Sequence, residues 1–413
     1  MTQIRRQLII VLTGLVVMAC PEGMPSSATA QDQPHTSLAT TMLESIDSKK
    51  GLCVLLGTEN GGLAVALCRD GQYLVHGLCM SRDAVKQMRK AIDRAELRGA
   101  VSVETGLTKR LPYSDNIVNL TVVENFGALS QDGLKLNEVL RVLRPGGVAW
   151  LGNWNTDGKA ISPAQLKELS NRTGIENPVV VQDAASVWVR VRKSRPNAMD
   201  EWTHQRGDAS GNPVSNDRQI GVPTGVRWVA GPNWPTGDRK ASTPSAVASK
   251  QHLAVVFQDE VATEEGLRKE NSLIVRDVYN GLRLWRRTAD SLELISDGGR
   301  IYTKIDGKLV ALDGENGEVT RTFEVAAPGE FLLSDGLLVV ANSKAVQALD
   351  SETGDSRWSA SLVSKRMRAG DGRLFVHVDN SRRGGDSQLA CFELKTGKEL
   401  WKVSTKLWAN GAA

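Results

Sequence analysis

The sequence predicts two consecutive folds: an α/β unit with a mainly parallel sheet, then an all-β unit made of repeats. Between residues 51 and 193, short apolar runs alternate with amphipathic stretches at helical spacing. After residue 226, four similar segments recur, each with a turn glycine between two apolar strands. The length of 413 residues also favours at least two domains.

The α/β unit, placed at residues 45–193, alternates strands and helices that glycines delimit. Alternation of this kind predicts a parallel sheet with helices on both faces, and ligands of such sheets bind where the strands end. Strand segments are expected at 51–57, 72–80, 100–106, 116–125, 148–153, 178–183 and 186–193. Helices are expected at 61–71, 82–99, 133–147 and 162–174.

The all-β unit, placed at residues 226–413, follows a linking arm at 194–225. Its turn glycines are separated by 36, 37 and 43 residues, a period that predicts the four-stranded blades of a β-propeller. Each turn precedes a strand ending on an aromatic residue that is expected to pack between neighbouring sheets. The glycines are Gly281, Gly317, Gly354 and Gly397, and the aromatic residues are Trp285, Phe323, Trp358 and Trp401.

Four repeats make at most four blades, which predicts an incomplete propeller with a bare sheet edge. The favoured explanation is that the chain is a fragment of a longer product. Closure of one ring by two copies and loss of later blades are the alternatives.

The N-terminus has the layout of a secretory signal peptide at residues 1–30. Arg5 and Arg6 precede an apolar stretch from Leu8 to Ala19, and cleavage is expected after Ala30. The predicted location is therefore the periplasm or cell envelope. Lipidation at Cys20 and an uncleaved anchor are the alternatives; after cleavage, no integral membrane span is expected.

Composition excludes few functions. The net charge of +4 is spread without long runs, so no nucleic-acid partner is expected. No Cys/His cluster predicts a metal site. Four cysteines follow the signal peptide. Their spacing allows either a disulfide bridge between neighbouring strands or buried free thiols. They are Cys53, Cys68, Cys79 and Cys391.

Two motifs carry a resemblance to a known family. The run "LPYSDNIVNLTVVENF" and the later "EVLRVLRPGGVAWLGN" resemble class I S-adenosylmethionine-dependent methyltransferases, of the small-molecule methyltransferase type 11 kind, over about residues 50 to 192. The resemblance implies a Rossmann-like methyltransferase fold. It also implies methyl transfer from S-adenosylmethionine if the site is active.

The resemblance places the cofactor site at six positions. These are Gly57, Glu59, Gly61, Cys79, Leu107 and Glu124. The family's acidic residue in the first strand corresponds to Leu55, its ribose-binding carboxylate to Cys79, and its adenine-binding Asp to Leu107. Each lost charge-assisted hydrogen bond costs about 1.5 to 3 kcal/mol, so S-adenosylmethionine is expected to bind weakly or not at all.

Other polar residues were considered for this site. Glu59, Asn60, Asp115, Glu124 and Asn125 are all expected at the carboxyl edge of the sheet, and we favour solvated loop residues over ligand contacts. His76, in an apolar strand, is interpreted as a core histidine rather than a base. The catalytic residue stays unknown.

The segment "EWTHQRGDASGNPVSNDRQIGVPTGVRWVAGPNW", residues 201–234, resembles the entry segment that leads onto the first blade in pyrroloquinoline-quinone (PQQ)-like propeller proteins of bacteria. Quinoprotein dehydrogenases of this fold use adjacent cysteines, whereas this unit has Cys391 alone, so PQQ is not expected as a cofactor. The predicted function is an exported protein with a degraded methyltransferase-like site and a propeller that binds a protein or envelope polymer. An active methyltransferase and a quinone-dependent oxidoreductase are the alternatives.

Overall fold

The computed structural model describes most of the chain after residue 32. The described residues are 33–59, 61–106, 109–154, 163–182, 186–222, 225–230, 245–263, 266–364, 366–378 and 387–405. The expected signal peptide, with Cys20, lies outside them, as do Asn60 and Leu107. Among the described residues, no helix has the length and apolar character that a membrane crossing requires.

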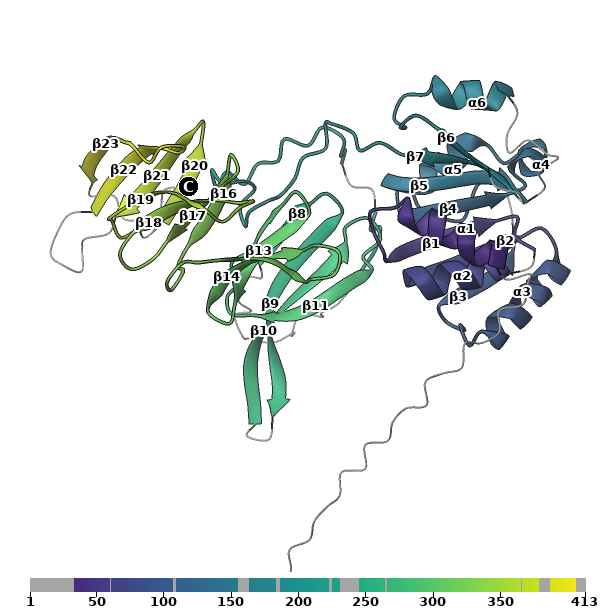
Figure 1. Cartoon of the computed structure of the whole chain (residues 1–413), viewed down its shortest axis with the longest axis horizontal. Helices are drawn as coiled ribbons and strands as arrows, with labels where there is room; N and C mark the ends of the chain where they lie inside the picture. The colour runs from purple at the N-terminus through teal and green to yellow at the C-terminus, as the bar shows by residue number, and fades with distance from the viewer. Residues whose placement is uncertain are drawn as a thin grey trace, which may run out of the picture.

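The first unit is a seven-stranded sheet in the order β3-β2-β1-β4-β5-β7-β6 (Figure 1). Strands β1 to β5 run parallel, whereas β7 pairs antiparallel with β5 and β6. The strands are β1 (Gly51–Leu56), β2 (Tyr73–Cys79), β3 (Val101–Thr105), β4 (Val118–Glu124), β5 (Leu143–Asn153), β6 (Val179–Gln182) and β7 (Val187–Arg192). This topology confirms the predicted Rossmann-like methyltransferase fold.

Helices cover both faces of this sheet. One face carries α1 (Gln33–Glu44), α2 (Gly62–Gly71) and α3 (Arg82–Arg94). The other carries α4 (Phe126–Gln131), α5 (Leu136–Val142) and α6 (Pro163–Ser170). Helix α1 was not predicted; its Leu38 and Met42 are buried in the same cluster as α2.

Two sequence expectations need correction or completion. The helix expected at 133–147 is shorter, because α5 ends at Val142 and the "LRPGG" segment already belongs to β5. Pro145 and the positive φ of Gly146 (75°) are incompatible with a continuing helix. The cysteines Cys53, Cys68, Cys79 and Cys391 are all free and buried, which decides against a bridge.

The second unit consists of four antiparallel four-stranded sheets, which we call blades 1 to 4 and which form a partial propeller (Figure 1). Blade 1 holds β8 (Ser245–Ser249), β9 (His252–Thr263), β10 (Gly266–Asp277) and β11 (Arg283–Ala289). Blade 2 holds β12 (Ile295–Asp297), β13 (Arg300–Ile305), β14 (Lys308–Asp313) and β15 (Val319–Phe323). Blade 3 holds β16 (Phe331–Ser334), β17 (Leu337–Ala341), β18 (Val346–Asp350) and β19 (Ser356–Ala360). Blade 4 holds β20 (Arg366–Gly370), β21 (Arg373–Val378), β22 (Ser387–Glu393) and β23 (Glu399–Thr405).

The last two strands of each blade are joined by the turn that the repeat predicted. All four turn glycines have positive φ, between 69° and 78°, which L-residues rarely adopt. An acidic residue four positions earlier closes the turn in blades 1 to 3; in blade 2, Asp313 Oδ1 accepts the N–H groups of Glu315 and Asn316. The pattern acid-x-x-x-Gly is thus a structural unit, and we call it the blade turn.

Candidate functional site

Five of the six predicted cofactor residues meet at the carboxyl edge of the first sheet, the edge where its parallel strands end. Gly57 and Glu59 follow β1, Gly61 precedes α2, Cys79 ends β2 and Glu124 ends β4. The sixth, Leu107, lies outside the described residues. The topology therefore brings five of the positions that the resemblance implies to one edge of the sheet.

The two glycines of this edge are explained by their backbone and packing. Gly57 and Gly61 have φ of 74° and 79°. A Cβ at Gly57 would lie 2.8 Å from both the Glu124 carbonyl oxygen and a Leu129 side-chain carbon. These glycines are needed by the fold, whether or not a ligand approaches them.

Glu124 is buried, so its interpretation as a solvated loop residue was wrong. Only 5% of it is exposed, and the Trp154 indole Nε1 donates to its Oε2 at 2.6 Å. Its Oε1 has no hydrogen-bond partner among the described residues. Burial raises the pKa of this carboxyl group above its usual range.

Aromatic rings from other elements surround Trp154. The ring of His35, on α1, stacks on it with centroids 4.6 Å apart, and Trp188 of β7 meets it edge-on. His35 also reaches the start of α2, where a Cβ on Gly62 would lie 2.6 Å from its ring. Side chains of α1, the end of β4 and the residue after β5 therefore lie together at the carboxyl edge of the sheet.

Cys79 offers no ionic anchor for a ribose. Its thiol is buried and its Sγ lies 3.3 Å from the Met88 sulfur. Burial, with the nearby carboxyl groups of Glu124 and Glu59, raises the pKa of the thiol to about 11. It therefore stays protonated near neutral pH and is neither a nucleophile nor a strong acceptor. Leu55 is fully buried in β1, and Glu59 is exposed.

Two further candidates lie away from this group. Asp115 was expected at the carboxyl edge, but it precedes β4 and lies at the opposite, amino edge, where it pairs with Arg141. Nδ1 of His76 is hydrogen-bonded with the Tyr113 hydroxyl at 2.7 Å, which agrees with a structural histidine. The parts of the chain that the structure describes hold no group of three potential metal ligands.

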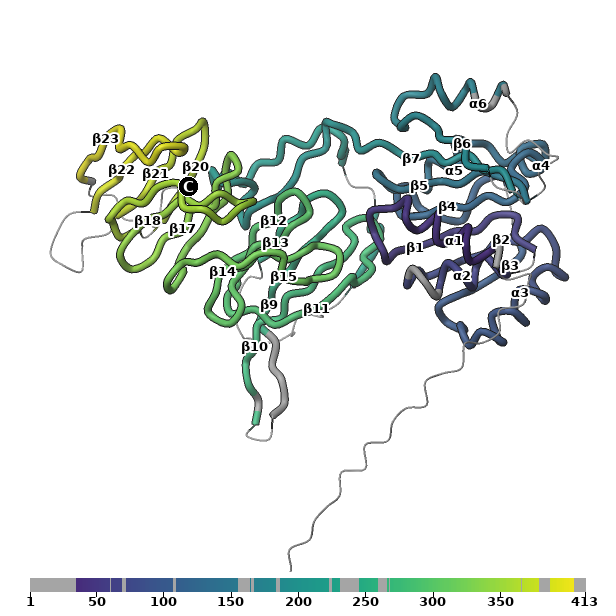
Figure 2. The backbone as a smooth tube through the Cα atoms, in the orientation of Figure 1, coloured from purple at the N-terminus to yellow at the C-terminus, as the bar shows by residue number. Residues whose placement is uncertain are grey.

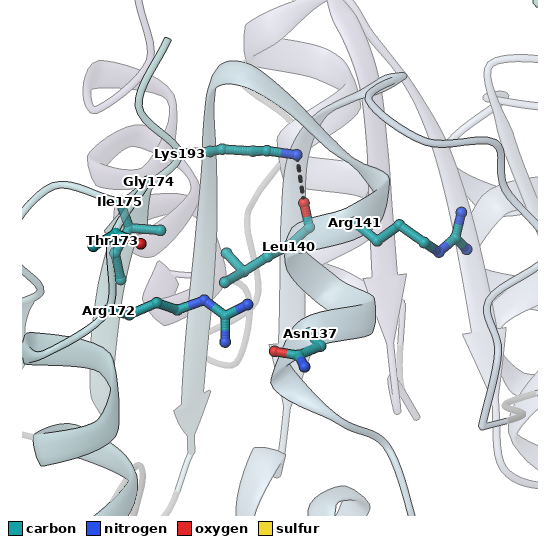
Figure 3. A pocket seen from close by; sticks show the side chains of 8 residues that line it. All are labelled: Asn137, Leu140, Arg141, Arg172, Thr173, Gly174, Ile175 and Lys193. Carbon is teal, nitrogen blue, oxygen red and sulfur yellow. Dashed lines mark hydrogen bonds between the residues drawn. The ribbon is translucent and has the colours of Figure 1, made fainter. Parts of the chain in front are cut away.

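A cavity of about 270 Å³ opens near the amino edge (Figure 3). Two of its basic residues, Lys193 and Arg141, are engaged internally. Lys193 Nζ donates to the Asn116 side chain and to the carbonyl groups of Leu140 and Leu143. Arg141 pairs with Glu138 and Asp115. The cavity is lined by Asn137, Leu140, Arg141, Arg172, Thr173, Gly174, Ile175 and Lys193. These internal bonds give Lys193 and Arg141 structural roles.

Comparisons with known families agree with this division. Residues 54–147 match the family model described as a methyltransferase domain. Residues 269–411 match the PQQ-repeat model described as outer membrane protein assembly factor BamB. The chain joins a methyltransferase-like domain to a PQQ-type repeat domain.

Solved structures that resemble the methyltransferase-like domain share little sequence with it. A Methanococcus maripaludis protein described as an S-adenosyl-L-methionine-dependent methyltransferase is 18% identical (41% of this chain, 89% of that chain, TM-score 0.34). A SAM-dependent methyltransferase from Aquifex aeolicus is 17% identical (39% and 98%, TM-score 0.30). Geranyl diphosphate C-methyltransferase from Streptomyces coelicolor is 13% identical (40% and 80%, TM-score 0.31). No curated protein sequence matches the chain significantly.

A polar contact between the two domains was not predicted. Asn119 is fully buried in β4 of the methyltransferase-like domain, and its Nδ2 donates to Asp277 of the first blade turn at 2.8 Å. Arg144, from the "RVLRPGG" motif, lies 3.6 Å from the same carboxylate. The sequence contained one sign of this contact, the polar Asn119 inside the apolar strand "NIVNLTVVEN". Its partner could not be predicted, because Asp277 lies 158 residues away along the chain.

The arm between the domains also has a role that the sequence did not reveal. We use "arm" for residues 194–230, whose described part crosses the first strands of the four blades (Figure 2). Trp202 exchanges backbone hydrogen bonds with Ala248 of β8. The N–H groups of Ser296, Leu333 and Ala369 donate to Thr203, His204 and Ala209 of the arm, respectively. The arm thus forms hydrogen bonds with at least one backbone group in the first strand of every blade, at edges that would otherwise be bare.

Proposed function

We propose that this chain is an exported, non-catalytic binding protein, in which the methyltransferase-like domain has lost S-adenosylmethionine turnover and the PQQ-type repeats hold a partner. The observation that carries the proposal is the bond between Trp154 and the buried Glu124 at the carboxyl edge. The protein's own indole satisfies this carboxylate oxygen, in the place where the fold usually holds its cofactor.

The loss of charged anchors supports the same conclusion. Cys79 stands where the family has a carboxylate for the two ribose hydroxyl groups, and Leu55 stands where it has an acid in the first strand. Each missing charge-assisted hydrogen bond weakens binding by about 1.5 to 3 kcal/mol, and about 1.4 kcal/mol is tenfold in affinity. Two losses together reduce the affinity by a factor of about a hundred or more.

Export and the scaffold role rest on other observations. The N-terminal pattern with Arg5, Arg6 and a short apolar stretch is that of a secretory signal. The repeat domain matches a family described as an outer membrane protein assembly factor, which supports a place in the cell envelope and a protein partner. Its single cysteine, Cys391, argues against quinone chemistry that needs an adjacent pair.

The test is calorimetric titration of S-adenosylmethionine into the purified full chain. We expect no heat of binding up to millimolar ligand, with S-adenosylhomocysteine giving the same result. The same titration is made with the variant Trp154→Ala for comparison. This substitution removes the hydrogen bond to Glu124 Oε2 and the indole ring beside that carboxylate. Binding to the unaltered chain at micromolar concentration would refute the proposal.

An active methyltransferase is the second candidate, and one observation favours it. Glu124 Oε1 is buried without a described hydrogen-bond partner, and such an oxygen is available to the amino group of a cofactor. In that case Glu124→Gln should abolish the heat of binding. The control variant is Glu399→Gln, which changes an exposed carboxylate in blade 4. This substitution should leave the heat of binding unchanged.

A further inference from the structure

The cavity near the amino edge of the first sheet is lined by three basic residues and by no acidic one (Figure 3). Helix α5 forms one wall, and residues 172–175, which follow α6, form the opposite wall. Lys193, directly after β7, completes the lining. A hollow lined by one sign of charge attracts ligands of the opposite sign, so this cavity of about 270 Å³ is suited to an anion.

The wall that contains Arg172 is held by backbone hydrogen bonds to the chain that follows β7. The Ser194 N–H donates to the Gly174 carbonyl at 3.0 Å. Ile175 forms an antiparallel bridge with Lys193. The side chains on this wall therefore project from a backbone that the sheet itself positions, which is the arrangement that a preformed binding site requires.

Two of the three cations in the lining are engaged within the protein. Arg141 Nη2 lies 2.6 Å from Glu138 Oε1, and Arg141 Nη1 lies 2.5 Å from Asp115 Oδ1. Lys193 Nζ donates to three oxygen atoms, and although burial lowers the pKa of Lys193 to about 8, it is still cationic at neutral pH. Two carboxylates against three cations leave one positive charge without compensation.

Arg172 carries this uncompensated charge. Its guanidinium extends across the cavity toward Asn137 of α5, whereas Arg141 points away from it (Figure 3). Arg172 is half-buried, and its side chain has no hydrogen bond or ion pair with any residue that the structure describes. The side chains of Asn137 and Thr173 supply further hydrogen-bond donors to the lining. A guanidinium fork held in this way matches the two oxygen atoms of a carboxylate.

The rest of the lining is apolar and limits the size of a ligand. Leu140 of α5 is buried, Ile175 is half-buried, and their side chains point toward each other across the cavity (Figure 3). The volume of about 270 Å³ lies below the roughly 300 to 1,000 Å³ of pockets that hold drug-sized ligands. A ligand of this cavity is therefore small, with a short apolar part beside its charged group.

We propose that this cavity binds a small monocarboxylate with a short aliphatic chain. Its carboxylate pairs with Arg172, and its chain lies between Leu140 and Ile175. One uncompensated positive charge suits a monoanion, whereas a phosphate dianion would bring one more negative charge than the cavity neutralises. The cavity lies at the amino edge of the sheet, away from the cofactor positions at the carboxyl edge, so this inference does not depend on S-adenosylmethionine binding.

The test measures the binding of pentanoate and of acetate to the full chain by saturation-transfer difference NMR. We expect saturable binding of pentanoate in the millimolar range. Arg172→Gln removes the charge but keeps a polar side chain, and it should weaken the binding of both anions at least about tenfold. The control is Arg82→Gln, which changes an exposed arginine of α3 on the other face of the sheet and should leave binding unchanged.

A second variant tests the apolar part of the cavity. Ile175→Ala should weaken pentanoate binding and leave acetate binding unchanged, because acetate has no chain to reach this side chain. Circular dichroism shows that each variant is folded, and Arg172 has no described side-chain partner whose loss would destabilise the chain.

Four results would overturn the proposal. Pentanamide that binds as tightly as pentanoate would show that the carboxylate is not recognised, and phosphate that binds more tightly would show that the site takes a dianion. The other two are unchanged binding in Arg172→Gln and the lack of saturable binding at high millimolar pentanoate.

Discussion

His204 links the arm to the first strand of blade 3 by a hydrogen bond that its imidazole ring can accept only when the ring is neutral. Its Nε2 accepts the Leu333 N–H at 3.1 Å, and its Nδ1 is hydrogen-bonded with the Thr203 hydroxyl at 2.8 Å. Burial lowers the pKa of His204 to about 4; nearby Asp208 opposes the shift, and Arg368 adds to it. A protonated Nε2 could not accept the N–H, so protonation removes this link.

We predict a pH-dependent stability that His204 controls. The unfolded chain takes up the proton at its ordinary pKa of 6.5 and the folded chain only near 4, so the stability is complete above pH 6.5 and falls as the pH drops toward 4. The slope is at most about 1.4 kcal/mol per pH unit. Urea unfolding between pH 7 and 4 measures this dependence. The variant His204→Gln, whose side chain cannot titrate, should lose less stability between these pH values than the unaltered chain. An equal pH dependence in both proteins would contradict this assignment.

Single residues at the carboxyl edge show where reasoning from the sequence stops. The positions of Cys79 and Glu124 at strand ends followed from the alternation of strands and helices, and the fold confirmed them. The burial of Glu124 did not follow, because it depends on Trp154, which follows β5, and on His35 of α1, which stacks on Trp154. Burial arises from contacts between elements distant in the chain, which periodicity does not encode.

Turn glycines of the propeller serve two purposes. Gly317, in the blade turn of blade 2, and Gly336, in the turn between β16 and β17 of blade 3, share the same φ of 74°, but they differ in surroundings. A Cβ at Gly317 would lie 2.7 Å from the Trp285 ring, whereas a Cβ at Gly336 would meet nothing within 4 Å. Comparing alanine at the two sites therefore separates backbone strain from the contact between blades.

We expect Gly336→Ala to lower the free energy of unfolding by about 1 to 2 kcal/mol, which is the strain of a left-handed alanine. Gly317→Ala should cost a further 1 to 3 kcal/mol or so, because the indole must move. Chemical denaturation measures both values. Adding Trp285→Ala should remove the excess, since the ring would then be absent. If the excess persists without the ring, the contact between blades is not its cause.

The elements themselves were largely predictable, and the exceptions have physical reasons. Period-2 runs and turn glycines located the blades, because these signals lie within a few residues of each other. Helix α1 was missed although its buried Leu38 and Met42 lie four residues apart, because α1 precedes the first strand of the alternating pattern. The path of the arm depends on backbone hydrogen bonds to blades 1, 2 and 4, which leave no residue pattern, and on the His204 side chain at blade 3.

At the scale of the whole molecule, the methyltransferase-like domain closes one end of the row of blades. Its amino edge contacts blade 1 through Asn119 and Arg144, so its carboxyl edge faces away from that contact. The arm covers the first strands of the blades, and blade 4 lies at the other end of the row (Figure 1). The row of blades is therefore covered by the methyltransferase-like domain at its blade 1 end.

The contact between the methyltransferase-like domain and blade 1 depends on Asp277. One carboxylate oxygen of Asp277 stabilises the blade turn, and the other makes the contact with the domain. Its Oδ1 accepts N–H groups of the turn, and its Oδ2 accepts from Asn119 beside Arg144. Asp277→Asn keeps a carbonyl oxygen for the turn but removes the charge, and leaves the guanidinium of Arg144, only 3% exposed, without its counterion. We expect a loss of about 3 to 5 kcal/mol in the free energy of unfolding.

Asp313→Asn is the matched control, because Asp313 has the same place in the blade 2 turn. It should cost less than about 1 kcal/mol, the worth of a weakened turn hydrogen bond. Amide exchange at Leu52, whose N–H donates to Asn119 Oδ1, reports the domain contact directly. That amide should lose protection in Asp277→Asn and keep it in Asp313→Asn. Equal losses in both variants would mean that Asp277 acts through its turn alone, and that the two domains are held together by other contacts such as the bond from Lys50 to the Leu284 carbonyl.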